Sequence, residues 1–483
     1  MINYLLQNNN IITLFFNGDN VSMNWLAKLI SGLIGAIGFV GVGVIVFTLI
    51  LKLITLPLDI YSKASMRKNS LKMEKMRPQL EKLQKQYAND QQMYNAKMME
   101  LYKKNGYSMF GACLPLIVSL VVFIFVLNAF SSYSKFTDLE LFNTMANDYS
   151  YAVLSYAPDL DEFEPEEKYS EPQEQGTDAE GKKQYLITKT VTYKETGKFI
   201  SIIETQTKIT TDKEDKDFSD KKAHPVSTVY YVETETMMND SKISEALDDL
   251  RTVIEQEKRA ELEKKSEEGT EITVSVSDDE VCKRYIQDIG REAAEKSYHE
   301  NKVGFLWVKN IWYPDTSFNH PIKTYSELKS FLGIKSNKNF IPETFYNEIT
   351  HNLKGEMKQP NGYFVLIIVS IGTMFLSQFI MSKSQKAQNE LQTANGQGAK
   401  TQKIMMIVMP IMFGIFSFMY SAAFSIYMII SSVFGIVSSL LINLFIDKKF
   451  KKLEEKELQE KYNRRIPQSA KSEVITRNEK KKR

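Results

Sequence analysis

The chain has 483 residues and a formal net charge of +2, which on their own would suggest a soluble protein of several domains. These averages mislead, because apolar residues and charges occupy separate stretches of the sequence. With only two cysteines, Cys113 and Cys282, and four scattered histidines, the composition excludes a disulfide framework and a zinc site. We expect no metal and no other cofactor.

The first long apolar stretch begins after a short N-terminal run that has no basic segment before it, so we expect it to be retained rather than cleaved as a signal peptide. Residues 29–51 carry no charge, Lys52 interrupts the run, and apolar character resumes as far as Leu58. About 20 apolar residues cross a bilayer core, so the stretch is too long for one span. We predict an extracytoplasmic segment over 1–36 that ends in an interfacial helix, and a first span over 37–58.

Residues 59–106 are polar and basic, and their pattern predicts a helical hairpin. Apolar side chains recur there at gaps of three, four or seven residues, as on one buried face of a helix: Met66, Met73, Met76, Leu80, Leu83 and Tyr87. After a probable turn-forming pair, Asn89 and Asp90, a second stripe consists of Tyr94, Met98 and Leu101. Two such stripes joined by a short turn favour two antiparallel helices, the first of which Pro78 is expected to kink.

Further apolar stretches predict four more spans. The second covers 107–130 and the third covers 361–381. The stretch 404–446 is too long for one span and fits two tightly joined ones, over 404–420 and 422–446.

Between the second and third spans lies a polar insert over 131–360. An acidic stretch at 158–180 predicts a flexible loop. Three segments rich in Val, Ile, Thr and Tyr predict strands: 185–193, 199–211 and 225–235. Two segments with helical spacing follow, 241–265 and 278–298. The insert is therefore expected to be a small α+β domain.

The charges of the loops predict the orientation in the membrane. Lys and Arg outnumber Asp and Glu by 11 to 5 in 59–106, by 4 to 1 in 382–403 and by 14 to 7 in the tail 447–483. In the insert, counted over 131–358, the ratio reverses to 30 against 45. Basic loops stay in the cytoplasm, so the hairpin, the second loop and the tail are expected inside, and the N-terminus and insert outside.

Several short motifs occur in a fixed order: KLITLPL at 52–58, MRPQL at 76–80, GACLP at 111–115, FLW at 305–307, GTMFLSQ at 372–378 and KIMM at 403–406. Together they resemble the YidC/Oxa/Alb family of membrane protein insertases, and the Gram-positive type in particular because no large domain precedes the first core span. The resemblance covers all five predicted spans and the hairpin, about half of the chain. The stretch from Asp138 to Asn301 resembles nothing in that family.

The resemblance implies an all-α polytopic membrane protein: a five-transmembrane-helix insertase core with a cytoplasmic helical hairpin and an extracytoplasmic α+β insert. It implies a bacterial cytoplasmic membrane protein that is not an enzyme, with its N-terminus outside and its C-terminus inside. The implied partners are nascent membrane proteins, the Sec translocon, the lipid bilayer, and the ribosome and targeting factors at the basic hairpin and tail. No small-molecule substrate is expected.

Family members have a hydrophilic groove between the spans, and the resemblance places its lining here at Lys52, Ser119, Thr373, Gln378, Tyr427 and Met428. This chain departs from the family pattern at three of these positions. Lys52 stands for an arginine, Ser119 for a glutamine, and Met428 for a tryptophan. The groove is therefore expected to be present but built from different side chains.

Several of these residues also have a simpler interpretation that involves no groove. Lys52 stands seven residues before Asp59, about 10 Å of helix, so its amine can reach the inner interface by extending along the span. Most hydroxyls in membrane helices, such as that of Thr373, bond to their own helix or to a neighbour. Gln378 lies near the inner end of its span and can be interfacial.

The hairpin supplies a second set of candidates, as contacts for substrate or ribosome: Met73, Met76, Arg77, Lys82, Lys85, Met98, Lys103 and Lys104. Methionine is flexible and polarisable, which suits contact with varied apolar segments, and the cations suit RNA or anionic lipid. The alternative is that the methionines close the hairpin's own seam and the lysines form its solvated face.

Two other classes of function remain open at this level. A small-solute transporter or channel would be favoured by similar halves or paired broken helices, which the sequence does not show. A receptor would act through the insert, and deletion of 138–301 distinguishes it from an insertase.

Overall fold

The computed structural model describes residues 23–107, 110–160, 162–220, 222–264, 273–333, 342–384 and 397–465. The described chain divides into two compact units. One, which we call the helical unit, consists of 23–134, 303–319 and 360–465. The other, the insert unit, consists of 135–302 and 320–359. The insert unit is thus built from two separate segments of the chain, and the short stretch 303–319 between them belongs to the helical unit.

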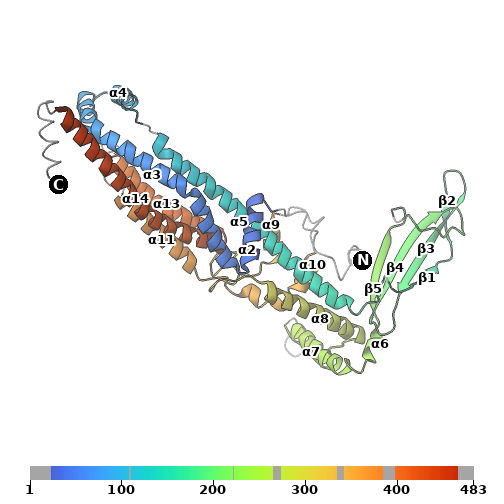
Figure 1. Cartoon of the computed structure of the whole chain (residues 1–483). Coiled ribbons are helices and arrows are strands. Elements are labelled where there is room, and N and C mark those ends of the chain that lie inside the picture. Colours follow the sequence, from blue (N-terminus) through green and yellow to red (C-terminus); the bar gives the residue numbers. More distant parts are fainter. Residues whose placement is uncertain are drawn as a thin grey trace, which may run out of the picture. The chain divides into compact units, whose positions relative to one another are not determined.

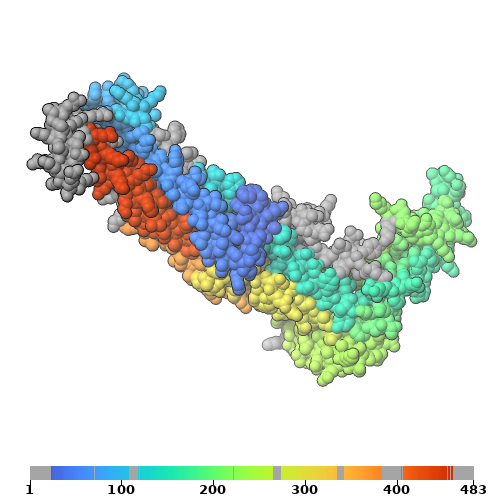
Figure 2. All heavy atoms as spheres, in the orientation of Figure 1, coloured from blue at the N-terminus to red at the C-terminus, as the bar shows by residue number. Residues whose placement is uncertain are grey.

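The described residues of the helical unit form seven α-helices (Figure 1): α2 Trp25–Ile37, α3 Val40–Gln86, α4 Gln91–Lys104, α5 Phe110–Leu154, α11 Val365–Ser384, α13 Gln397–Met419 and α14 Ala422–Arg465. Helix α14 contacts both α3 and α11, and α11 also contacts α13. Figure 2 shows the surfaces of α3 and α14 side by side. The long helix α5 contributes its first part to the helical unit and its second part to the insert unit.

Helices α2 and α3 are separated by a sharp break. The side chain of Asn24 caps α2 by accepting a hydrogen bond from the Ala27 amide at 2.8 Å. Gly38 ends α2 in the left-handed conformation, with φ of 79°, which costs least at glycine. A Cβ at Gly43 would lie 2.6 Å from the Ile34 side chain, so α2 packs closely on the start of α3.

Within the described residues, four helices have a stretch long and apolar enough to cross a membrane: α3, α5, α11 and α14. The predicted span over 404–420 falls on α13, whose described apolar part, Met406–Met419, is shorter than a full span. The chain is therefore a mostly helical membrane protein, and the fifth span stays a prediction. Three of the helices exceed 40 residues, about 60 Å or more, which is twice the thickness of a bilayer core.

The end of α3 pairs with α4. Helix α3 continues through Pro78 to Gln86, and the Asp90 side chain then caps α4 by accepting from the Met93 amide at 2.9 Å. The apolar stripes of the two helices meet in one cluster: Met73, Met76, Leu80 and Tyr102, with Met98, Leu101 and Tyr107 packed around them. The two helices therefore form a helical hairpin, whose position on the cytoplasmic side stays a prediction.

The insert unit contains an antiparallel sheet of five strands: β1 Glu166–Tyr169, β2 Gln173–Thr177, β3 Lys183–Tyr193, β4 Ile200–Thr210 and β5 Val226–Val232. The order is β1-β3-β4-β5, and β2 also pairs with β3. The three strands predicted from composition are confirmed as β3, β4 and β5. The flexible loop predicted over 158–180 is wrong, because it contains β1 and β2.

The reason for that error is visible at β1. Its residues are polar, but their backbone bonds to β3 in a regular register, with Glu167 opposite Val191. The carboxylate of Glu167 also pairs with Lys189 at 2.6 Å. A neighbouring strand thus supplies the partners that an acidic composition alone does not reveal.

The insert unit also contains five α-helices within its described residues: α6 Thr234–Met238, α7 Ser244–Glu263, α8 Asp278–Asn301, α9 Tyr325–Leu332 and α10 Glu343–Ile349. Helix α8 contacts α6, α7 and α10, and both α8 and α10 contact the second part of α5. Two short 3₁₀ helices follow, η3 His351–Leu353 and η4 Glu356–Lys358. The predicted helices at 241–265 and 278–298 are confirmed as α7 and α8. The core joins Phe142 and Tyr149 of α5 to Ile286 and Ala294 of α8 and to Tyr346 of α10.

Candidate functional site

Lys52 lies on α3 and is the only charged residue between Val40 and Leu58. Its side chain is half-buried, and among the described residues it makes no hydrogen bond and no ion pair. The hydroxyl of Thr48, one turn earlier, is buried and donates to the Val44 carbonyl at 2.7 Å, and it makes no hydrogen bond with Lys52. A charged group in an apolar span is costly unless water or a ligand solvates it. We therefore expect the ammonium group of Lys52 to lie in a polar environment.

The buried face of α14 is lined by small and polar residues. Three serines and one glycine share this side with two apolar residues, at gaps of three and four: Ser425, Met428, Ser432, Gly435, Ser439 and Ile442. A Cβ at Gly435 would lie 3.8 Å from the Ser377 hydroxyl of α11, so this face meets α11. Small residues let helices approach closely. The same face also carries hydroxyls into the interior, and that of Ser425 is buried without a hydrogen-bond partner among the described residues.

Helix α11 contributes further hydroxyls. Ser370 is buried, donates to the Ile367 carbonyl at 2.8 Å and lies 3.4 Å from the Ser417 hydroxyl of α13. Thr373 donates to carbonyls of its own helix at 2.9 and 3.0 Å, as the simpler interpretation expects. Gln378 is half-buried and forms no hydrogen bond with any described residue, so its amide is available.

Tyr427 and Met428 contact different neighbours because successive residues of a helix point about 100° apart. Met428 belongs to the face of α14 that carries the serines. The Tyr427 ring packs on Phe424 at 6.2 Å and on Phe130 of α5 at 6.2 Å, within a cluster of aromatic side chains. Lys52, Gln378 and Met428 thus lie on α3, α11 and α14, of which α14 contacts the other two. Tyr427 lies in the aromatic cluster, and the side chain of Ser119 is outside the described residues.

A buried carboxylate of segment 303–319 holds the start of α11. Asp315 is fully buried and accepts hydrogen bonds from the Trp307 indole at 3.2 Å and from the amides of Tyr363 and Leu366 at 2.8 and 2.6 Å. It therefore caps α11 from a point 51 residues away in the sequence. The cap is tight, because a Cβ at Gly362 would lie 1.8 Å from the carboxylate.

The same segment holds the start of α14. The carbonyls of Ile311 and Tyr313 accept from the amides of Ala423 and Ala422 at 3.0 and 2.8 Å. These amides have no partner within α14, so the segment satisfies the first turn of the helix. Sequence reasoning noted this segment only as part of a resemblance. It missed the cap, because no local pattern links Asp315 to a helix that begins 50 residues later.

The hairpin candidates divide into two groups. Met73 and Met76 are buried in the hairpin's own seam, and Met98 is packed against that seam. The cations are exposed: Arg77, Lys82, Lys85, Lys103 and Lys104. Arg77 pairs with Glu81 at 3.2 Å. The exposed methionines of α4 are Met93 and Met99, which the apolar periodicity did not single out.

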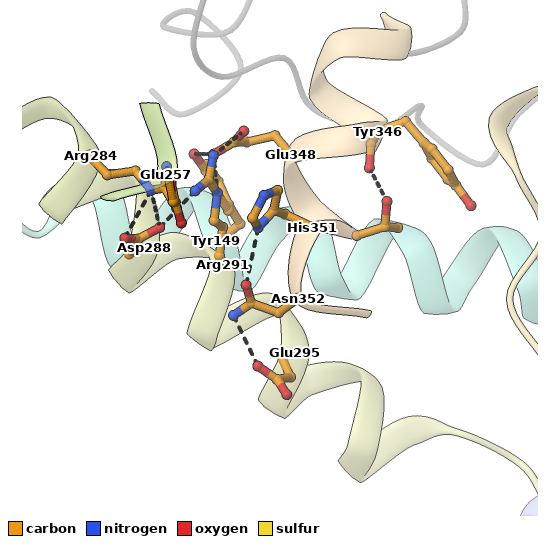
Figure 3. A network of polar contacts seen from close by, with 11 residues as sticks. Tyr149, Glu257, Arg284, Asp288, Arg291, Glu295, Tyr346, Glu348, His351 and Asn352 are labelled. Carbon is orange, nitrogen blue, oxygen red and sulfur yellow. Dashed lines mark hydrogen bonds and ion pairs between the residues drawn. The ribbon is translucent and has the colours of Figure 1, made fainter. Parts of the chain in front are cut away.

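A dense polar network lies in the insert unit (Figure 3). Arg291 of α8 is only 8% exposed and forms a two-point ion pair with Glu348 of α10, at 2.7 and 2.9 Å. It also donates to Asp288 at 2.7 Å, which in turn accepts from Arg284 at 2.9 Å. The Tyr149 hydroxyl of α5 donates to Glu348 at 3.3 Å. The network therefore connects α5, α8 and α10.

The electrostatics of this network indicate a structural role. Burial raises the pKa of Tyr149 above its ordinary value, and the Glu348 carboxylate adds to the effect. Burial also lowers the pKa of His351, with the positive charge of Arg291 as a second cause. Every carboxylate in Figure 3 has a cationic or amide partner, so none is left available for chemistry. Within the described ranges, no group of His, Cys, Asp and Glu is placed to hold a metal ion.

Comparison with known families gives a match to the model described as 60Kd inner membrane protein, over residues 32–168 and 294–452. The matched residues include α3, α4, α11, α13 and Lys52. The unmatched stretch between the two parts contains β2 to β5, α6 and α7.

Several curated proteins are similar to the chain, and three named "Membrane protein insertase YidC" serve as examples. The one from Fusobacterium nucleatum is 38% identical over 103 residues, which cover 21% of this chain and 48% of that protein. The one from Clostridium tetani is 36% identical over 120 residues, or 24% and 53%. The one from Ectopseudomonas mendocina is 40% identical over 100 residues, or 21% and 16%. The matches thus span about half or less of the length of these relatives.

Proposed function

Because the chain belongs to the YidC/Oxa/Alb family of 60Kd inner membrane proteins, whose model matches more than half of its residues, we propose that it integrates nascent membrane proteins into the bacterial cytoplasmic membrane. The observation that carries the proposal at the level of the site is Lys52. It is an ionisable side chain without an ion-pair partner among the described residues, on a helix that packs against α14.

The proposed mechanism is physical and involves no covalent step. A hydrated groove between α3, α11 and α14 would give the polar part of a client segment a place within the bilayer, lined by Lys52, Ser119, Thr373, Gln378, Tyr427 and Met428. The local barrier to crossing falls because polar groups are not transferred directly into hydrocarbon. The client's own apolar helix then moves into lipid, and its burial supplies the driving force. The buried, partnerless Ser425 hydroxyl supports a polar interior.

The proposal includes a topology and a set of partners. Five spans place the N-terminus and the insert unit outside, and the α3–α4 hairpin and tail inside, as the charge counts favour. The exposed cations of the hairpin are suited to contact the ribosome, targeting factors or anionic lipid. The Sec translocon is the proposed partner for larger clients. Met93 and Met99 are better placed for apolar clients than the methionines inside the seam.

A depletion–complementation experiment tests the proposal. The full chain is expressed in bacterial cells depleted of their own insertase, and integration of a small single-span reporter is followed by protease protection. We expect integration to be restored. The proposal fails if the chain accumulates in the membrane and the reporter stays on the inner side.

A deletion variant distinguishes an insertase from a receptor that acts through the insert unit. In it, residues 135–302 and 320–359 are each replaced by a short linker, which removes the insert unit and keeps segment 303–319 with its cap on α11. An insertase is expected to retain at least part of its activity, because the proposed groove lies in the helical unit. Complete loss of activity in a variant that still accumulates would favour a role of the insert unit itself.

A further inference from the structure

Three charged residues lie on one face of α3. Asp59 follows Lys52 by seven residues and Lys63 follows Asp59 by four. At 100° per residue, the three side chains point within about 20° of one direction. They extend over about 16 Å of helix, with alternating signs of charge.

This charged face lies largely opposite the most exposed apolar side chains of the helix. The two most exposed apolar side chains along the same stretch, Tyr61 at 70% and Ile54 at 69%, lie on the opposite side of α3, as does Leu58 at 53%, whereas Leu53 at 57% lies about 100° from Lys52 around the helix. Lys52, Asp59 and Lys63 are each half-buried instead. The charges therefore lie on a more buried side of α3 than its most exposed apolar side chains do.

None of the three charges is compensated by a close partner. Among the described residues, Lys52, Asp59 and Lys63 make no ion pair within 4 Å, although Asp59 lies within electrostatic reach of both lysines. One turn further, the next cation is compensated, because Arg67 lies 3.8 Å from Asp447 of α14. The three uncompensated charges thus act together, with a net charge of +1.

We propose that Asp59 determines which charges the groove accepts, by opposing the positive potential that Lys52 and Lys63 create for a client's translocated segment. This inference rests on the proposed insertase function. It adds that Asp59 sets the selectivity of the groove for the charge of the translocated segment. With Asp59 in place the face carries only a small excess of positive charge, so both acidic and mildly basic segments can enter. Without it the excess doubles, and acidic segments are favoured over basic ones.

The test uses the purified full chain in liposomes and three versions of one single-span reporter, whose translocated tail carries Asp, Asn or Lys at the same positions. The measurement is the protease-protected fraction of each tail, expressed as the ratio of the Asp to the Lys version. Asp59→Asn is expected to raise this ratio by well over tenfold, because one unit charge about 10 Å away in a partly hydrated site acts in opposite directions on the Asp and Lys tails. Lys63→Gln is expected to lower it by a similar factor.

Two variants serve as controls. Asp59→Glu keeps the charge and is expected to keep the ratio of the unmodified chain. Glu74→Gln makes the same change of charge at an exposed site on α3, about 22 Å further along the helix, and should leave the ratio unchanged because salt screens that distance.

The outcomes separate the two proposals. If the unmodified chain inserts none of the reporters, the insertase function itself fails. If it inserts them but Asp59→Asn gives the same ratio as Glu74→Gln, the role of Asp59 is overturned. If Asp59→Asn does not incorporate into liposomes, Lys63→Gln decides, and an unchanged ratio there contradicts the inference.

Discussion

The helical unit and the insert unit treat buried charge in opposite ways. In the insert unit, Arg291 forms ion pairs with Glu348 and Asp288 at hydrogen-bonding distance, and the Tyr149 hydroxyl also donates to Glu348. In the helical unit, Lys52 and Asp59 lie on one face of a helix without a close partner among the described residues. A buried charge that is fully paired costs an architecture little, whereas removal of one partner leaves the other charge unpaired and is strongly destabilising. A charge without a partner costs stability where it stands, which is the usual sign of a functional position.

The two units also resemble known proteins to different extents. The family match covers most of the helical unit, and the stretch that it omits contains most of the sheet. Asp315 shows that the helical unit also satisfies a buried carboxylate, through hydrogen bonds at the start of α11. The difference between the two units can therefore be tested by substituting charged residues that have close partners, such as Arg291, and charged residues that have none, such as Lys52.

The largest expected effect is at Asp315. Asp315→Ala leaves the Trp307 indole and the amides of Tyr363 and Leu366 without a partner in a buried site. Each unsatisfied buried donor costs about 1–3 kcal/mol, so we expect a loss of roughly 4 kcal/mol in the helical unit. Thermal unfolding of the full chain in detergent measures it. Asp315→Asn keeps one acceptor oxygen, which can still accept from Trp307 and Tyr363 but leaves the Leu366 amide without a partner, so it should lose less than Asp315→Ala.

Arg291→Met should destabilise the insert unit by about 3 kcal/mol, because it leaves Glu348 in a largely buried site without its cation. The double variant Arg291→Met with Glu348→Met should recover much of the loss, since a buried pair replaced by apolar residues is close to neutral. The rate of limited proteolysis within the insert unit measures the stability of the single and the double variant. Equal losses in the single and double variants would show that the pair itself, rather than the unpaired charge, determines the stability.

Gly290→Ala should cost the insert unit about 2 kcal/mol. A Cβ there would lie 2.6 Å from the Tyr149 ring, which must shift together with its hydrogen bond to Glu348. Gly355→Ala is the matched control, because nothing lies within 4 Å of the added carbon. Similar melting temperatures for the two variants would contradict the tight contact between α5 and α8.

At Lys52 we expect a change in activity rather than in stability. A unit charge acting over about 10 Å at an effective dielectric constant of 20 contributes roughly 1.7 kcal/mol, or somewhat more than tenfold. Lys52→Gln should therefore reduce insertion of a reporter with an acidic tail about tenfold, and Lys52→Arg should retain it. The complementation assay measures the effect. Full activity of Lys52→Gln on several such reporters would mean that the amine extends to the interface instead.

The smallest effect near neutral pH concerns the buried tyrosines of the insert unit. Burial raises the pKa values of Tyr149, Tyr298 and Tyr346 above the ordinary value of about 10. The folded unit therefore keeps these protons where the unfolded chain loses them, and stability falls only as the pH rises above about 10. Unfolding followed by tyrosinate absorbance should show a shallower decline for Tyr149→Phe. Tyr151→Phe, at an exposed site on α5, should show the decline of the unmodified chain.

Much of the fold could be predicted from the sequence because its signals are local. The apolar stretches predicted helices, and the alternation of Val, Ile, Thr and Tyr predicted β3, β4 and β5. The acidic β1 and β2 escaped, because strand pairing with β3 outweighs composition. Among the site residues, Lys52 could be found as a charge in an apolar run, whereas the burial of Met73 and Met76 depends on α4.

By itself, the sequence determined which stretches are apolar, how charge is divided among the loops, and which family the motifs resemble, since each of these is a property of neighbouring residues. Only the tertiary structure decided that Asp315 caps α11 and that Ser425, Ser432 and Ser439 form one buried face. It also decided that the charged face of α3 points away from its most exposed apolar side chains. These features depend on contacts between segments far apart in the chain, and a local pattern contains no information about such contacts.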